Sequence, residues 1–173
     1  YARVSGEWCV TNRPTPGFAN TEEGYAAFTA SRGFGAVAGQ ITEACLRSEA
    51  GLRDADGDSP DWIELYNAGT ESVSLDGWYL SDDPEEPARW RIPDITLAPG
   101  EYYIIFASGK NRTQGELHTD FALSAGESVI LTTPIGSTAD RVELTQTEPD
   151  ASLARIGSDW RECASPTPGK ANG

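Results

Sequence analysis

The sequence has few basic side chains. Lys and Arg number 13 against 27 Asp and Glu, so the formal net charge of the 173 residues is −14. Proteins that bind nucleic acid need Lys and Arg to displace counterions from phosphates. The densest basic segments, at residues 89–91 and 110–112, do not offset the acidic field. Nucleic acid is therefore not an expected partner, whereas divalent cations and basic partners fit an acidic surface.

Cysteine is also scarce, and long apolar runs are lacking. Cys9, Cys45 and Cys163 are an odd number, and no pair has the CxxC spacing of a zinc or redox site. A Cys45–Cys163 bridge would require neighbouring first and last core strands, and we expect free, half-buried thiols. No apolar run reaches the roughly 20 residues of a transmembrane helix, so we expect no membrane insertion in this segment.

The two ends of the sequence resemble each other. Residues 1–20 align without gaps, at an offset of 152, with residues 153–172, and both segments contain PTPG and end in Ala-Asn. Two similar strands within one domain would explain this identity less well than a tandem array. We therefore predict that residues 1–20 are the terminal strand and exit turn of an upstream copy. Because an unpaired edge strand invites association, residues 1–13 should fold back along the sandwich or pair with a neighbouring molecule.

A linker is predicted over residues 21–38. Asn20 or Thr21 can cap a short helix at about residues 21–32, with Glu22 and Glu23 in its first turn, where they suit the helix dipole. Gly33 can end this helix with a positive φ. A hinge rich in Gly and Ala follows, and we place the start of the main domain at residue 39.

Residues 39–173 change to a pattern of short strands separated by turn residues. In residues 61–67, Ile63 and Leu65 face one side and Trp62 faces the other. Many short strands at regular spacing, without helices between them, predict an all-β antiparallel sandwich or barrel. Trp78 and Trp90 are expected in the core, and residues 101–107, which are apolar on both faces, are expected to form a central strand.

The most specific part of the sequence is the string from Gly77 to Lys110. Together with DWIELYNAG before it and GELHTDFALSAGESVILTTPIGSTADRVEL after it, this string resembles the lamin-tail domain family. The resemblance covers about residues 39–173 and is closer to the bacterial branch than to the nuclear lamins.

This resemblance implies an immunoglobulin-like β-sandwich that acts as a non-catalytic interaction module. Bacterial members occur in cell-surface or secreted multidomain proteins, some beside kinase-like spore-coat domains, so an extracellular or cell-surface location is expected. The family has no catalytic residues to transfer. Nuclear members meet chromatin, but the charge of −14 does not support DNA binding here. The expected partner is a protein, a glycan or a neighbouring tandem copy.

An acidic loop is the candidate metal site. Asp54, Asp56 and Asp58 have the 1, 3, 5 spacing of an EF-hand-like loop, and hard carboxylate oxygens at this spacing can bind Ca²⁺. The glycine, however, stands at loop position 4 rather than 6, and Leu65 occupies position 12. The alternative is a solvated Asx-turn loop between two strands. Apart from Ca²⁺ at this loop, no cofactor is expected.

Catalytic and ligand-binding alternatives rest on few residues. His118, the single histidine, lies near Asp120 and could suggest a small hydrolase, but a hydrogen bond that fixes a loop is the favoured role. The SDDPEEP segment, residues 81–87, could meet a basic partner or simply be a solvated connection. A carbohydrate-binding module would use exposed aromatic side chains, for which the candidates are Trp62, Tyr79 and Tyr103.

Overall fold

The computed structural model describes residues 2–4, 7–9, 15, 17–21, 23–24, 39–146 and 148–173. The regular elements from residue 39 onward are all strands, as the alternating pattern predicts. Their bounds, with those of the N-terminal pair, are β1 Ala2–Val4, β2 Glu7–Cys9, β3 Gly39–Cys45, β4 Asp61–Asn67, β5 Val73–Ser74, β6 Tyr79–Ser81, β7 Trp90–Arg91, β8 Thr96–Leu97, β9 Tyr102–Ala107, β10 Ser128–Thr132, β11 Thr138–Glu143, β12 Ser152–Ile156 and β13 Asp159–Cys163.

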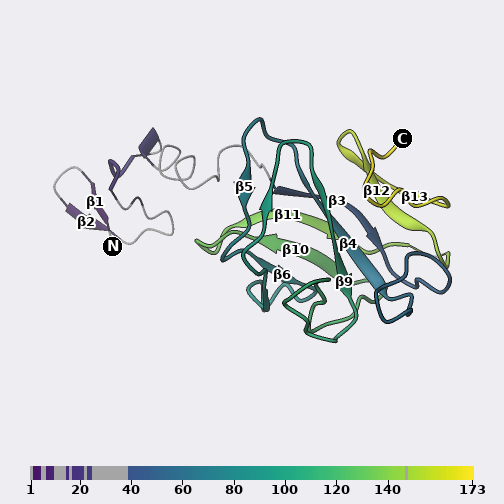
Figure 1. Cartoon of the computed structure of the whole chain (residues 1–173). Coiled ribbons are helices and arrows are strands. Elements are labelled where there is room, and N and C mark those ends of the chain that lie inside the picture. Colours follow the sequence, from purple (N-terminus) through teal and green to yellow (C-terminus); the bar gives the residue numbers. More distant parts are fainter. Residues whose placement is uncertain are drawn as a thin grey trace.

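Two antiparallel sheets form the sandwich (Figure 1). One has the strand order β13-β12-β3-β4-β9, and the other has the order β11-β10-β6-β7. Side chains alternate between the faces of each strand, so Ile63 and Leu65 of β4 point into the space between the sheets, where both are fully buried. Trp78 and Trp90 join the same core, as predicted.

The prediction that residues 101–107 form a central strand is wrong. β9 lies at the edge of the five-stranded sheet and has β4 as its neighbouring strand. The free side of β9 is covered by the chain that follows it. The Phe106 N–H donates to the Leu117 carbonyl (2.9 Å), and the Thr119 N–H donates to the Phe106 carbonyl (2.8 Å). This covering segment explains why an edge strand can be apolar on both faces.

The outer face of the five-stranded sheet is also partly covered. Trp62, Cys45 and Phe106 form a second, smaller apolar cluster there, against which Leu52 from the loop after β3 packs. Cys45 and Cys163 are free thiols, as expected, but Cys45 is fully buried rather than half-buried. Burial raises the pKa of the Cys45 thiol to about 12, so this side chain stays protonated and behaves as an apolar group.

Near the N-terminus, β1 and β2 pair with each other as an antiparallel hairpin, which is separate from the two large sheets. The sequence predicted instead a single strand that folds back or pairs with a neighbouring molecule. Within the predicted linker helix, residues 23 and 24 are helical, and the Gly24 N–H donates to Thr21 Oγ1 (3.0 Å) as in an N-cap. The predicted helix after residue 24 and the hinge up to residue 38 lie outside the described residues.

Candidate functional site

The acidic loop brings its three aspartates together. Asp54 is buried, and its Oδ1 accepts the backbone N–H groups of Asp56 (3.0 Å) and Asp58 (2.9 Å), which curls the chain into an Asx-type turn. Gly57 adopts a φ of +87° within this turn. One carboxylate oxygen from each aspartate lies within 4.8 Å of the other two. The spacing in the sequence therefore does predict a convergent set of oxygens.

The ammonium group of Lys110 lies among these carboxylates. Its Nζ is 2.5 Å from Asp54, 2.8 Å from Asp56 and 2.9 Å from Asp58. Arg112 also contacts Asp56, at 2.7 Å. The hydrogen bonds from Lys110 and then Arg112 lower the pKa of Asp56 to about 2. Because Lys110 occupies the place of a cation, Ca²⁺ could use this loop only by displacing the lysine.

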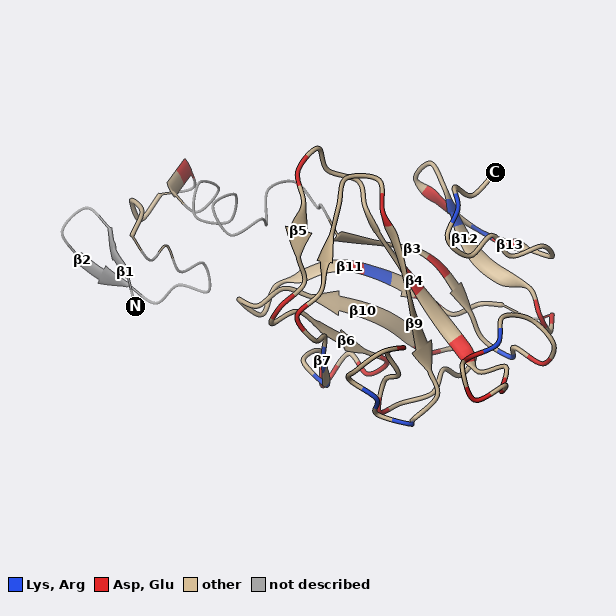
Figure 2. Ribbon diagram, in the orientation of Figure 1, with Lys and Arg blue, Asp and Glu red and all other residues tan. Residues whose placement is uncertain are grey.

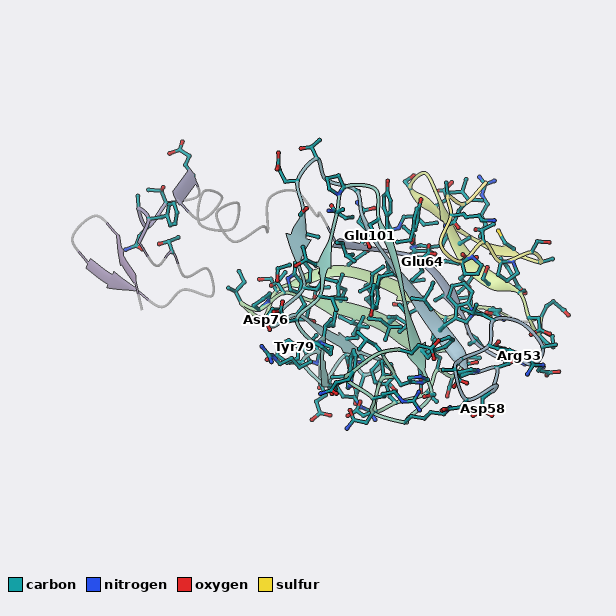
Figure 3. All side chains as sticks on the ribbon, in the orientation of Figure 1. Arg53, Asp58, Glu64, Asp76, Tyr79 and Glu101 are labelled. Carbon is teal, nitrogen blue, oxygen red and sulfur yellow. The ribbon has the colours of Figure 1, made fainter. Side chains whose placement is uncertain are left out.

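The candidate aromatic residues do not form one platform. Trp62 is wrongly predicted as exposed, since only 1% of its surface is accessible beneath the loop after β3. Tyr79 and Tyr103 are half-buried but belong to different sheets, on β6 and β9. Figure 3 shows Tyr79 near Asp76 and far from Asp58. The candidates are therefore scattered over the molecule.

A different aromatic pair lies on the outer face of the five-stranded sheet. Tyr66 of β4 and Tyr102 of β9 stand opposite each other, with stacked rings whose centroids are 4.4 Å apart. Both are half-buried. Their signal in the sequence was the alternation that places Tyr66 on the same strand face as Trp62, but the pairing of the two strands could not be read from it.

His118 has the structural role that the sequence favoured. Its side chain is fully buried, stacks on Phe106 with the ring centroids 5.1 Å apart, and shares a 2.8 Å hydrogen bond between Nδ1 and Ser108 Oγ. Burial lowers the pKa of His118, so the imidazole is neutral near pH 7. Its buried Nε2 has no hydrogen-bond partner among the described residues. A substrate cannot reach this histidine, which fixes the segment that covers β9.

The SDDPEEP segment forms one wall of an open groove. Figure 2 shows acidic residues in many of the loops of the sandwich, and this groove collects several of them. Its volume is about 400 Å³. Two arginines in it are paired, Arg89 with Asp82 (2.6 Å) and Arg141 with Glu143 (2.7 Å). The groove is lined by Asp82, Asp83, Pro84, Arg89, Gly126, Glu127, Ser128, Arg141 and Glu143.

Two buried glutamates outside the predicted sites lie on β3 and β4. Glu43 and Glu64 point to the outer face of the five-stranded sheet and are fully buried beneath the C-terminal turn, residues 166–172. Glu43 accepts the Thr167 N–H (3.0 Å) and a short bond from Ser152 Oγ (2.5 Å). Glu64 accepts the Gly169 N–H (2.6 Å) and the hydroxyl of Thr42 (2.7 Å).

These bonds make the glutamates anchors for the end of the chain. Burial raises the pKa of Glu64 to about 7, against the hydrogen bonds from Thr42 and Gly169, which lower it. The only signal in the sequence was one glutamate in each of two adjacent and largely apolar strands. Since both side chains are covered by protein, we assign them to closure of the fold rather than to chemistry on a ligand.

Comparison with known proteins fits this architecture. A model of the Lamin Tail Domain family matches residues 47–146, which is more than half of the chain. No curated protein matches. No helix among the described residues is long and apolar enough to cross a membrane. The chain belongs to the lamin-tail domain family, whose members are immunoglobulin-like, non-catalytic modules of the protein-interaction type.

Proposed function

We propose that this chain is an interaction module of a bacterial cell-surface or secreted multidomain protein and that it binds a basic segment of a partner protein. The family supports a role in protein interaction rather than catalysis. The observation that carries the basic partner is the groove between the SDDPEEP loop and the β10–β11 hairpin, where four carboxylates stand against two arginines.

The charge of this groove is not neutralised internally. Asp82 and Glu143 have arginine partners. The carboxylates of Asp83 and Glu127 instead accept backbone N–H groups, from Glu85 (2.8 Å) and Ser124 (3.0 Å) respectively. Each of these two carboxylates keeps a second oxygen that can accept a hydrogen bond from a Lys or Arg side chain of a partner. A groove with this excess of acceptors fits an extended basic peptide better than an acidic or apolar one.

The test is fluorescence anisotropy with a labelled lysine-rich peptide and a glutamate-rich peptide of equal length. We expect the unchanged protein to bind the basic peptide and to bind it less well as salt rises. Asp83→Asn with Glu127→Gln keeps the acceptors for the two backbone N–H groups and should weaken binding severalfold.

The matched control is Glu71→Gln with Asp94→Asn, which removes the same two charges at exposed positions outside the groove. This variant should bind like the unchanged protein. If both variants bound the lysine-rich peptide equally weakly, the peptide would be responding only to the net charge of the protein. The groove would then not be the binding site.

A carbohydrate-binding module is the second candidate, favoured by the stacked pair of Tyr66 and Tyr102. Half-buried aromatic faces can stack on sugar rings through their apolar surface. A glycan array probed with the unchanged protein and with Tyr102→Ala separates the two proposals. Glycan binding that is lost in Tyr102→Ala and kept in Asp83→Asn with Glu127→Gln would favour carbohydrate over the basic peptide. Calcium at the acidic loop would be an accessory to either function.

A further inference from the structure

The N-terminal hairpin has the same strand register as the C-terminal one. In β1–β2, Ala2 pairs with Cys9, Arg3 with Trp8, and Val4 with Glu7. In β12–β13, the residues 152 positions later form the same pairs: Ala154 with Arg161, Arg155 with Trp160, and Ile156 with Asp159. The sequence similarity of the two ends is therefore also a structural similarity.

The turns after the two hairpins repeat each other as well. The Thr15 hydroxyl donates to Asn20 Oδ1 (2.5 Å), as the Thr167 hydroxyl donates to Asn172 Oδ1 (2.7 Å). In each turn the threonine carbonyl accepts an N–H from three residues later, at 3.0 Å. Both turns place their glycine in the left-handed region, Gly17 at φ +82° and Gly169 at φ +77°.

The C-terminal hairpin uses these features to dock on the sandwich. The Nη2 group of Arg155 contacts both carboxylate oxygens of Asp140 on β11 (2.6 and 2.7 Å), and its Nε donates to the Ile41 carbonyl (3.0 Å). Its guanidinium also lies over Trp160, 4.7 Å from the ring centroid. β12 pairs with β3, which would otherwise be an open edge.

The C-terminal turn completes the docking through three of its residues. Thr167 donates to Glu43 and Gly169 donates to Glu64. The Asn172 side chain donates to the Thr42 carbonyl (2.8 Å). Each donor thus meets an acceptor on β3 or β4.

The residues whose side chains or turn N–H groups dock in this way recur at the N-terminal end. Identical residues occupy the places of Arg155, Trp160, Thr167, Gly169 and Asn172, namely Arg3, Trp8, Thr15, Gly17 and Asn20. By contrast, several exposed positions of the C-terminal hairpin and turn differ, although the exposed Ala171 is shared with Ala19. Arg161, Glu162 and Lys170 are exposed, and the N-terminal segment has Cys9, Val10 and Phe18 there. This division is expected if residues 1–20 bind the same kind of surface.

We propose that residues 1–20 are the closing hairpin of a second lamin-tail sandwich that precedes residue 21 in the same polypeptide. Its binding surface would be an edge strand equivalent to β3. Two buried glutamates there would accept the N–H groups of the turn, as Glu43 and Glu64 do for the C-terminal turn. Among the described residues, β1 and β2 pair only with each other, and the one such edge, on β3, is occupied by β12. This inference does not depend on the acidic groove.

The experiment builds the missing sandwich from the chain itself. Residues 39–152 are fused directly before Tyr1 of the full chain, so that Ser152 precedes Tyr1 as it precedes Leu153 in the natural order. Calorimetry should then show an unfolding enthalpy about twice that of the unfused chain, because that enthalpy scales with the number of folded residues. A control fusion carries residues 153–172 in place of residues 1–20.

A matched variant assigns the effect to docking. Thr15→Val with Asn20→Ala should lower the melting temperature of one sandwich in the fusion and leave the unfused chain unchanged. Doubling in the control fusion but not in the test fusion would overturn the proposal. An unfused chain that dimerises, and becomes monomeric when residues 1–20 are removed, would show docking on another molecule and overturn the assignment to a preceding copy.

Discussion

Lys110 is the side chain that decides whether the acidic loop can hold a metal. Its ammonium lies within 2.9 Å of all three aspartates and so supplies the positive charge that the loop needs. The sequence spacing of the aspartates indicates that their oxygens converge. It cannot show a lysine more than 50 positions away, because that contact depends on how the loop after β9 packs beside the loop after β3.

Replacement of Lys110 should convert the loop into a calcium site. In Lys110→Met the three carboxylates repel one another, and a divalent cation removes this repulsion. We expect Ca²⁺ at 10–100 times its Kd to raise the free energy of unfolding of the variant by about 1–3 kcal/mol, and the unchanged protein to respond much less. Thermal melting with and without Ca²⁺ measures this difference.

Lys170→Met is the control for this experiment, since Lys170 is an exposed lysine on the C-terminal turn. It should behave as the unchanged protein does. If isothermal titration finds no Ca²⁺ binding to Lys110→Met, the acidic loop is only a structural turn held by its ion pairs.

At the scale of elements, the C-terminal turn makes stability depend on pH through Glu64. Because burial raises the pKa of Glu64 to about 7, the native protein keeps a proton that the unfolded chain releases near pH 4.5. The contribution of protonated Glu64 to the stability of the folded protein is fully present below about pH 4.5, and it is lost as the pH rises through 7. Across this window the loss is on the order of 3 kcal/mol.

Glu64→Gln should remove this dependence. A glutamine can accept the Gly169 N–H with its oxygen and donate to the Thr42 hydroxyl with its nitrogen, as a neutral glutamic acid would. We expect the variant to match the unchanged protein near pH 5 and to be the more stable of the two at pH 8.5. Urea unfolding at both pH values measures this, with Glu71→Gln as an exposed control. Equal stability of the unchanged protein at pH 5 and pH 8.5 would contradict the assignment.

At this scale, the sequence predicts the strands and their buried faces but not the loops that cover them. Alternation of apolar residues identified the strands and the core positions of Trp78 and Trp90, because one face of each strand must be buried. The burial of Trp62 and the edge position of β9 were missed. Both depend on loops that pack against the outside of the sandwich. The alternation of side chains along a strand does not predict where such loops lie. Likewise, the hydrogen bonds of Glu43 and Glu64 to the last turn join segments that are 124 and 105 positions apart, respectively.

At the scale of the whole molecule, the sandwich should not need the segment before β3. The core is drawn from residues 41–153, and the N-terminal hairpin pairs only with itself among the described strands. We expect a chain without residues 1–36 to unfold cooperatively, with a melting temperature within a few degrees of that of the full chain. Circular dichroism during heating measures this, and loss of the cooperative transition would show that the domain begins earlier.

The hydrogen bond between Asn172 and Thr42 closes the sandwich across 130 positions, and this separation has a consequence for biosynthesis. A ribosome adds about 5–20 residues per second, so β3 would wait on the order of 10 seconds for its partner β12 to be made. During that time the nascent chain already contains residues 1–20, with the same docking residues. A hairpin made early could occupy the open edge and delay correct folding. An upstream sandwich that captures this hairpin first would remove the competitor before β3 emerges.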